Sequence, residues 1–480
     1  MDHDRLRPES DPGKILPVHQ PGDLRRQSGR PAPIRRPAHF RLLSGPCEHI
    51  GSRANTDGIA ARGCGAIARS AVVPVCLLLA AVAVAADEWP EFRGATGQGN
   101  ASGAEPPIEW STTKNVAWRQ PVPGAGWSSP VIGGGRVFLT SRLAAATGDV
   151  SLQLLCFDAA TGQIEWQAEI FGSAEVPPRP GHEKSLPASA TAVIDGEHIY
   201  VYFGHHGAAC LDRSGRIVWR NPLLRFDSGP ANASSPVIVG DRFIYLAEGA
   251  IAPSVVALDK HTGKILWRVR RTLPTKLKFS FGTPLAIVGA GRSQLIVPGD
   301  GSVAALDPQD GREIWRVRHS EIYAVMPRPV FAHGLVFVSA GYNRGELRAI
   351  RPDGTGDVTD THVVWRTIKG APVTPGLVAA GDELYAVNDA GVATCWEAAT
   401  GRVVWQERIP GNYSASPIAA DGRIYFQNET GIGTVLRAGR AFAELASNDL
   451  GEPTLASYAV AEHAVFIRTA GHLYRIERQP

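Results

Sequence analysis

The sequence predicts an all-β protein, an eight-bladed β-propeller of four-stranded antiparallel blades. Short runs of β-forming residues alternate with glycine turns along most of the chain, which contains 52 Gly and 36 Pro in 480 residues. A strand–turn–strand pattern, most complete at 255–267, recurs toward the C-terminus, and a second strand pair recurs between its copies. A period of about forty to fifty residues is typical of propeller blades.

The hairpin at 255–267 defines the outer half of each repeat. Val255 to Leu258 are β-formers, Asp259 to Gly263 form the turn, and Ile265 begins the second strand. Both faces of this hairpin are apolar, so it must pack between similar units. Its copies end at Trp166, Trp219, Trp267, Trp315, Trp365 and Trp405.

A second recurring unit supplies the inner half of each repeat. A small residue, often followed by Pro, begins a short apolar strand, and a Gly turn leads into another β-rich strand, as in 129–132 with 136–139 and in 235–238 with 243–246. Each period therefore contains four antiparallel strands, which is the composition of one blade.

The sequence beyond Trp405 contains two more periods. In the first, Phe442 stands where the other copies have Trp. The last period supplies only three strands, whereas 115–122, near the N-terminal end of the repeats, has no partner of its own. We expect the N- and C-terminal strands to share the eighth blade, which would close the propeller without open edges.

The aromatic residue of each outer strand has a structural explanation. It can pack over the turn of the neighbouring blade and bury on the order of 200 Å². We therefore expect blade docking, and not ligand stacking, from Trp118, Trp166, Trp219, Trp267, Trp315, Trp365, Trp405 and Phe442.

The N-terminal part does not resemble the repeats. Residues 1–61 are rich in Arg and Pro, so we interpret them as disordered or as lying before the true translation start. Residues 62–86 have basic residues, a short apolar run and small residues at the end, which is typical of a signal peptide; a membrane anchor is the alternative. Residues 87–114 then form a lead segment, and 115–480 the propeller. These features predict an exported protein of the periplasm or cell envelope, without a membrane span in its mature form.

Charge and cysteine usage exclude some functions for the folded part. Residues 1–86 hold 12 of the 49 basic and 7 of the 46 acidic residues, which leaves 37 basic and 39 acidic residues and no basic footprint for nucleic acid. Cys156, Cys210 and Cys395 occupy equivalent positions two residues before the acidic residue of a hairpin. Equivalent positions in different blades face different neighbours, so we expect buried free thiols.

The pattern from Ala257 to Trp267 resembles the tryptophan-docking motif of the eight-bladed quinoprotein alcohol dehydrogenases. It is also similar to the broader group of PQQ-like propeller repeat proteins, which includes the outer-membrane assembly lipoprotein. The stretches 89–94, 200–204, 328–338 and 412–417 resemble a secreted bacterial subfamily of that group with unassigned function. The resemblance covers residues 87–480 and implies the fold, but the motif is architectural and implies no activity.

The sequence departs from the catalytic equipment that the quinoprotein resemblance would imply. Those enzymes have adjacent cysteines beside the quinone and carboxylates around a calcium ion, and this sequence has no Cys-Cys pair, no calcium-loop spacing and no Cys-x-x-Cys-His sequence. We therefore expect no cofactor. Only the resemblance to quinoprotein dehydrogenases suggests PQQ and calcium as cofactors. The enzyme that this resemblance would imply is a quinone-dependent oxidoreductase.

A binding site, if the chain has one, is expected in loops on one face. In an up-and-down blade, the loops between second and third strands and those between successive blades lie on the same face. The unusual residues of these loops are Arg179, His182, Glu183, Lys184, His205, His206, Tyr342, Asn343, Arg344, Asn388, Asp389, Asn412 and Tyr413.

Two interpretations of this face stay open beside ordinary loop polarity. His182, His205 and His206 could bind zinc if their nitrogens converge, or they could hydrogen-bond to carbonyls and water. Basic residues on the face, such as Lys184 and Arg344, would favour an anionic or carbohydrate-like ligand.

The sequence thus leaves two classes of function. The first is a monomeric, non-catalytic scaffold that presents its loop face to a protein or another cell-envelope component. The alternative is an enzyme, either a quinone-dependent dehydrogenase-like protein or a hydrolase using the loop histidines and Glu183, which would require a pocket with convergent acid and base groups.

Overall fold

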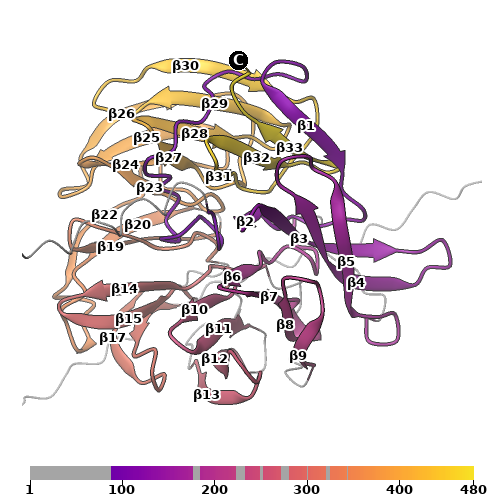
Figure 1. The fold of residues 1–480 in the computed structure, drawn as a ribbon. Coiled ribbons are helices and arrows are strands. Elements are labelled where there is room, and N and C mark those ends of the chain that lie inside the picture. Colours follow the sequence, from indigo (N-terminus) through magenta and orange to yellow (C-terminus); the bar gives the residue numbers. More distant parts are fainter. Residues whose placement is uncertain are drawn as a thin grey trace, which may run out of the picture. The chain divides into compact units, whose positions relative to one another are not determined.

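The computed structural model describes residues 88–176, 184–222, 233–248, 252–271, 280–299, 301–319, 325–342 and 344–479. Strands over these residues form eight sheets with antiparallel four-stranded blades, so the predicted eight-bladed propeller is confirmed (Figure 1). Its described helical structure is the short 3-10 helix η1 (Gly204–His206). Among the described residues, no helix is long and apolar enough to cross a membrane.

The first four blades follow the chain, each from its innermost to its outermost strand. Blade 1 consists of β2 (Val131–Gly133), β3 (Arg136–Ala144), β4 (Val150–Asp158) and β5 (Ile164–Phe171), and blade 2 of β6 (Val193–Asp195), β7 (His198–Tyr202), β8 (Ala208–Asp212) and β9 (Ile217–Asn221). Blade 3 consists of β10 (Val237–Val239), β11 (Arg242–Ala247), β12 (Ser254–Asp259) and β13 (Ile265–Arg270), and blade 4 of β14 (Leu285–Gly289), β15 (Arg292–Val297), β16 (Ser302–Leu306) and β17 (Glu313–Arg318).

The next three blades repeat this order. Blade 5 consists of β18 (Val330–Ala332), β19 (Leu335–Ala340), β20 (Glu346–Ile350) and β22 (Val363–Thr367), and blade 6 of β23 (Val378–Ala380), β24 (Glu383–Val387), β25 (Val392–Glu397) and β26 (Val403–Arg408). Blade 7 consists of β27 (Ile418–Ala420), β28 (Arg423–Gln427), β29 (Ile432–Arg437) and β30 (Glu444–Asp449).

The eighth blade joins the two ends of the propeller. Its strands β31 (Ala459–Ala461), β32 (Ala464–Arg468) and β33 (His472–Ile476) come from the C-terminal end, and β1 (Val116–Pro121) pairs antiparallel with β33 as the outermost strand. In Figure 1 the indigo β1 lies beside the yellow β33. The predicted sharing of the last blade is confirmed, and it leaves no end of the repeat unpaired.

The apolar core lies between neighbouring blades. Between blades 1 and 2, for example, Phe138 and Leu154 pack with Ile199 and Val201, and all four side chains are buried. Because each sheet is apolar on both faces, each blade is stable only with a neighbour on either side.

A β-bulge at the same point of each outer hairpin positions the tryptophan. In blade 3, Ala257 pairs with Trp267 and the next residue, Leu258, pairs with Ile265, so one residue of β13 is left over. The same shift occurs in blade 2, where Cys210 pairs with Trp219. In these two blades the indole beside the bulge bonds to the turn of the neighbouring blade.

The indole of Trp219 shows how one blade contacts the next. Its Nε1 donates a hydrogen bond of 2.7 Å to the carbonyl oxygen of Lys260, in the hairpin turn of blade 3. A Cβ on Gly263 of the same turn would lie 2.6 Å from the ring, so the ring packs directly on this glycine. Equivalent hydrogen bonds join Trp118 to Ala159, Trp166 to Arg213, Trp267 to Pro308, Trp365 to Ala398 and Trp405 to Gly439.

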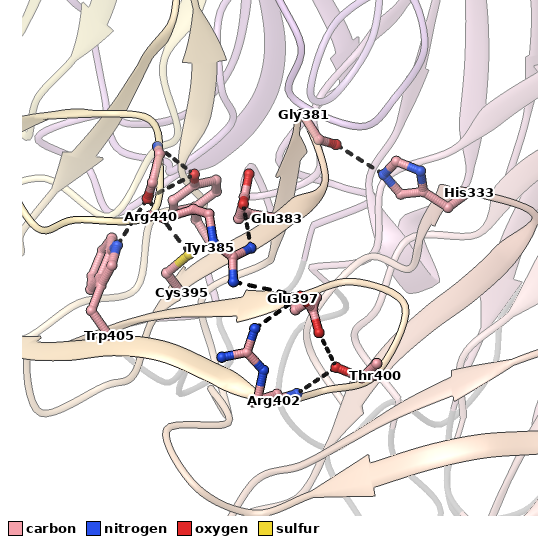
Figure 2. Close-up of polar contacts among 11 residues, drawn as sticks. His333, Gly381, Glu383, Tyr385, Cys395, Glu397, Thr400, Arg402, Trp405 and Arg440 are labelled. Atoms are coloured by element: carbon pink, nitrogen blue, oxygen red, sulfur yellow. Dashed lines mark hydrogen bonds and ion pairs between the residues drawn. The ribbon is translucent and has the colours of Figure 1, made fainter.

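Figure 2 shows this contact between blades 6 and 7. The Gly439 carbonyl accepts from Trp405, and the Gly439 amide donates to the Tyr385 hydroxyl at 2.7 Å. Arg440 lies 3.1 Å from a Glu383 oxygen and 3.5 Å from a Glu397 oxygen. Polar atoms of the blade 7 turn are therefore held by side chains of blade 6.

Two positions differ from the repeat that the sequence predicts. The Trp315 indole donates to Gln294 of its own blade at 2.7 Å. Trp315 is buried because β21 (Gly356–Asp357), from the long turn of blade 5, pairs in parallel with β17. In blade 7, Ala446 and not Phe442 lies opposite Val435 at the tryptophan position. Phe442 instead packs edge-on against Trp405, with ring centroids 5.3 Å apart.

The cysteines in the described part of the chain, Cys156, Cys210 and Cys395, are buried and free, as predicted. Burial in apolar surroundings raises the pKa of each thiol to about 12. They serve as small apolar side chains of the core.

Candidate functional site

Hydroxyl side chains form a belt around the centre of the propeller. They stand at one equivalent position of the blades, two residues before the first residue of the innermost strand. The Ser129 amide donates to Thr191 Oγ1 at 3.0 Å, and the Thr191 amide donates to Ser235 Oγ at 2.9 Å. The Ser235 amide in turn donates to Thr283 Oγ1 at 3.0 Å. One blade is thereby hydrogen-bonded to the next.

The same bonds run through blades 6, 7, 8 and 1. The Gly376 amide donates to Ser416 Oγ at 3.0 Å, and the Ser416 amide donates to Ser457 Oγ at 2.9 Å. The Ser457 amide donates to Ser129 Oγ at 3.1 Å and closes the seam between blades 8 and 1. We call Ser129, Thr191, Ser235, Thr283, Ser416 and Ser457 the hydroxyl belt. Each of these oxygens accepts an amide hydrogen, so its O–H can still donate to another group.

Arginine side chains fill the two positions at which the belt lacks a hydroxyl. Blade 5 has Arg328 there, and blade 6 has Gly376. A Cβ on Gly376 would lie 2.7 Å from Nη1 of Arg93, so the missing side chain makes room for this guanidinium. Arg93 comes from the lead segment and is fully buried.

Backbone carbonyls hold the Arg93 guanidinium. Its Nη2 donates to the carbonyl oxygens of Gln98 at 2.8 Å and Pro417 at 3.2 Å, and also to that of Leu377. Burial, together with the positive charge of Arg328, lowers the pKa of Arg93 to about 9. The guanidinium is thus still charged at neutral pH.

Arg328 of blade 5 also holds the lead segment. Its Nε donates to the Pro284 carbonyl at 3.0 Å, its Nη1 donates to the Phe92 carbonyl, and its Nη2 lies 3.3 Å from Glu91 Oε1. Burial raises the pKa of Glu91, although the charge of Arg328 opposes this shift.

The lead segment closes one end of the channel. Trp89 forms a β-bridge with Ile132 of blade 1, Gln98 Oε1 accepts from the Phe331 amide of blade 5, and Asn100 forms a bridge with Ala419 of blade 7. Since blades 1 and 5 lie on opposite sides of an eight-bladed propeller, residues 89–101 must cross the axis. We call residues 89–101 the plug.

A cavity of about 570 Å³ lies against the other side of the belt. Its floor includes Phe92 of the plug together with the belt, and its apolar wall includes Trp127, Phe281 and Met326. The described residues that line it also include Lys184, Ser185, Ser189, Ala233, Arg328, Tyr342, Thr374, Ser414 and Leu455. No carboxylate or amide side chain is among them.

An ion pair joins two distant loops beside this cavity. Nζ of Lys184, in the connection between blades 1 and 2, lies 2.5 Å from Oε1 of Glu429 in blade 7. The Ser414 hydroxyl donates to the same oxygen. Lys184 therefore joins the connection between blades 1 and 2 to blade 7.

The structure brings together two of the predicted face residues, Lys184 and Tyr342, which both line the cavity. Arg344 and Asn412 are exposed outside it. The predicted residues Arg179, His182, Glu183 and Asn343 lie outside the described residues.

Three other predicted face residues have local structural contacts. Asn388 Oδ1 accepts from the amides of Ala390 and Val392, and Asp389 Oδ2 accepts from the amides of Val373 and Thr374. Tyr413 is buried, its hydroxyl donates to the Pro410 carbonyl at 2.9 Å, and burial raises its pKa to about 12. These contacts shape the loops.

The loop histidines lie side by side but away from the cavity lining. The rings of His205 and His206, in η1, have centroids 3.9 Å apart, and His206 is buried. The third member of the predicted zinc set, His182, is outside the described residues. Within the described part of the chain, no group of three or more His, Cys, Asp or Glu residues could hold a metal ion.

The cavity lining does not fit the calcium-bound quinone that the resemblance to quinoprotein dehydrogenases implies. Calcium is held mainly by carboxylate and carbonyl oxygens, and the described lining offers hydroxyls and cations in place of carboxylates.

Sequence reasoning missed the belt and the plug. The signal for the belt was a Ser or Thr at one position in six of the eight periods, which was used only to locate the start of a strand. The signal for the plug was the stretch 89–94, whose Trp, Arg and Gly have no counterpart in the repeats.

Fold and site together define a β-propeller with one plugged end and a hydroxyl-lined cavity at the other. The family model of the outer membrane protein assembly factor BamB matches residues 102–175, 153–357 and 345–444, and the chain belongs to this family. No curated protein matches the sequence significantly.

Solved structures show the same fold. BamB from Moraxella catarrhalis is similar with a TM-score of 0.54 and 14% identity, over 76% of this chain and 99% of that chain. The computationally designed Ika8 protein has a TM-score of 0.51 and 11% identity, over 78% of this chain and 100% of that chain. Quinohemoprotein alcohol dehydrogenase from Comamonas testosteroni reaches a TM-score of 0.42 with 14% identity, over 82% of this chain and 81% of that chain, a level that supports no conclusion about activity.

Proposed function

We propose that this protein is a non-catalytic scaffold of the cell envelope that presents its cavity-side face to a partner protein. The observation that carries the proposal is the asymmetry of the propeller. The plug is hydrogen-bonded to blades on several sides and fixes one end, whereas the other end has the cavity and the exposed side chain of Tyr342 at its rim. Family membership supports a role in outer-membrane assembly, for which the family is named.

The repeat motif supports a scaffold because its polar groups have structural contacts. Asp259 Oδ1 accepts from the amide and hydroxyl of Thr262, each at 2.8 Å, and these bonds lower the pKa of the carboxyl. The Trp219 indole and the Gly263 backbone are engaged in blade docking. Motif residues with such contacts stabilise the fold and leave function to the loops.

An exported location and a monomeric state belong to the same proposal. The basic and apolar residues of 62–86 favour export, and membership in a family named for outer-membrane assembly agrees with an envelope location. No observation of the described cavity favours the dehydrogenase-like or hydrolase alternative, because its lining contains no paired acid and base.

Site-specific photo-crosslinking in the native cell tests the scaffold. A benzoylphenylalanine at Tyr342 should give a discrete adduct with an envelope protein, identified by mass spectrometry. The same residue placed at Lys264, on the exposed outer hairpin of blade 3, is the control and should give no such adduct. Equal labelling at both positions, or none at Tyr342, would contradict the proposal.

A further inference from the structure

The cavity presents a ring of hydroxyl groups that can donate hydrogen bonds. The six hydroxyls of the belt each accept one amide hydrogen, so each keeps its O–H free to donate and one further lone pair. The charged side chains of the described lining, Lys184 and Arg328, are cations, each ion-paired with a carboxylate outside the lining, Glu429 and Glu91. Such a lining complements a ligand whose polar atoms are acceptors.

Buried cations lie just beyond the belt. Arg93 approaches the gap at Gly376, and its Nε and Nη1 have no hydrogen-bond partner among the described residues. Arg468 of blade 8 donates through Nη1 to the Ser128 hydroxyl and to the Thr140 carbonyl, next to Ser129 of the belt. Both guanidiniums are buried, and within the described part of the chain their hydrogen bonds go to neutral oxygens.

Among the residues that the structure describes, the carboxylate in contact with this group of arginines is Glu91, which pairs with Arg328. A buried positive charge without a counter-ion is costly, and a negative charge placed nearby lowers that cost. The base of the cavity is therefore a favourable place for an anion.

The apolar side chains of the cavity wall favour an anion that also has an apolar part. Trp127, Phe281, Met326 and Leu455 line the cavity, and Phe92 covers part of its floor. Its volume of about 570 Å³ is in the range of sites that bury most of a small organic molecule.

We propose that the cavity binds a small organic anion, with a carboxylate or phosphate accepting hydrogen bonds from the hydroxyl belt and an aromatic or aliphatic body against Trp127 and Phe281. The ligand contacts the belt, whereas partner binding is proposed at the rim of the same cavity, where Tyr342 lies. Binding forms no covalent bond and requires no cofactor.

Isothermal titration calorimetry on the full chain tests the site with three related probes. 2-Naphthoate and 1-naphthyl phosphate carry the two anionic groups, and 2-naphthamide is the neutral counterpart. At least one anion should bind with one site per chain and at least about tenfold more tightly than the amide. Which anion binds better distinguishes a carboxylate ligand from a phosphate ligand.

Variants then locate the binding. Thr374→Glu places a negative charge in the lining and should weaken binding of the preferred anion by about tenfold or more, with little effect on the amide. Thr112→Glu makes the same change at an exposed position outside the lining and should have no effect. Leu455→Trp fills the cavity and should abolish binding of all three probes.

The proposal is overturned if neither anion binds at millimolar concentration, if the amide binds as tightly as the anions, or if Thr374→Glu leaves anion binding unchanged. Thermal unfolding of each variant verifies that it is folded. Anion binding that persists when Tyr342 gives no crosslink would overturn the scaffold and leave this site intact.

Discussion

The contact between Trp219 and Gly263 predicts a large effect from one added methyl group. In Gly263→Ala the new Cβ would lie 2.6 Å from Cε3 and 2.7 Å from Cδ2 of the indole, and the backbone at this position has φ of +69°. The left-handed backbone costs an alanine roughly 1–2 kcal/mol, and overpacking of a buried contact costs roughly 1–3 kcal/mol more. We expect the free energy of unfolding to fall by about 2–5 kcal/mol.

Gly240→Ala is a matched control for this prediction. Gly240 is in the same blade, at φ of +59°, and its Cβ would meet nothing within 4 Å. It should therefore lose only the backbone part, about 1–2 kcal/mol. Urea unfolding followed by tryptophan fluorescence measures both variants.

Equal losses in the two variants would refute the argument that the indole requires a glycine. A second result bears on the same point. In a Trp219→Leu background the indole is absent, so adding Gly263→Ala should cost no more than Gly240→Ala does. If Gly263→Ala lowers the free energy of unfolding as much in this background as in the native sequence, the strain comes from a contact other than the indole.

Three further predictions concern buried groups. Burial, with the charges of Arg348 and Arg271, lowers the pKa of His319 to about 3, whereas in the unfolded chain it is about 6.5. As the pH falls below about 6.5, the unfolded state therefore binds the proton first, and the free energy of unfolding should drop by about 2 kcal/mol by pH 5. Urea unfolding of His319→Gln at a series of pH values should lack this decrease. The exposed His261→Gln variant is the control and should retain it. Burial raises the pKa of Cys156, Cys210 and Cys395 to about 12, so iodoacetamide at pH 8 should leave them unmodified in the native protein and alkylate them in guanidinium. Peptide mapping measures the modification, and an alkylated native thiol would contradict the prediction. Arg93→Met removes the hydrogen bonds to Gln98, Leu377 and Pro417, so amide hydrogen exchange in 94–101 should accelerate about tenfold or more. Unchanged protection of these amides would show that the plug is held without the Arg93 side chain.

The local parts of the fold could be predicted because their signals are close together in sequence. The hairpin turn at Asp259–Gly263 is formed by a capping carboxylate and a glycine four residues later, and the structure has the Gly263 amide bonded to the Asp259 carbonyl at 2.8 Å. Repetition of this signal gave the blade count, and the unpaired strand before blade 1 gave the shared eighth blade. Phe442 was placed wrongly in the strand register because blade 7 has no tryptophan to mark the bulge.

The candidate site was harder to predict because its residues are far apart in the chain. Lys184 and Tyr342 were found as unusual loop residues, but their place around one cavity with Phe92 depends on which loops meet at the axis. Arg93 and Gly376 are 283 positions apart, and only the folded chain shows that one occupies the space that the other leaves.

The sequence by itself determined the strands, the turns, the number of blades and the buried free thiols, since each depends on propensity and on a repeated local pattern. Only the tertiary structure decided that residues 89–101 plug one end, that hydroxyls of six blades form a belt, and that arginines stand where the belt is broken. These features are created when equivalent positions of different blades converge on one axis. That convergence brings together atoms that have no relation in sequence, and it is where the charge and hydrogen-bonding character of the cavity is set.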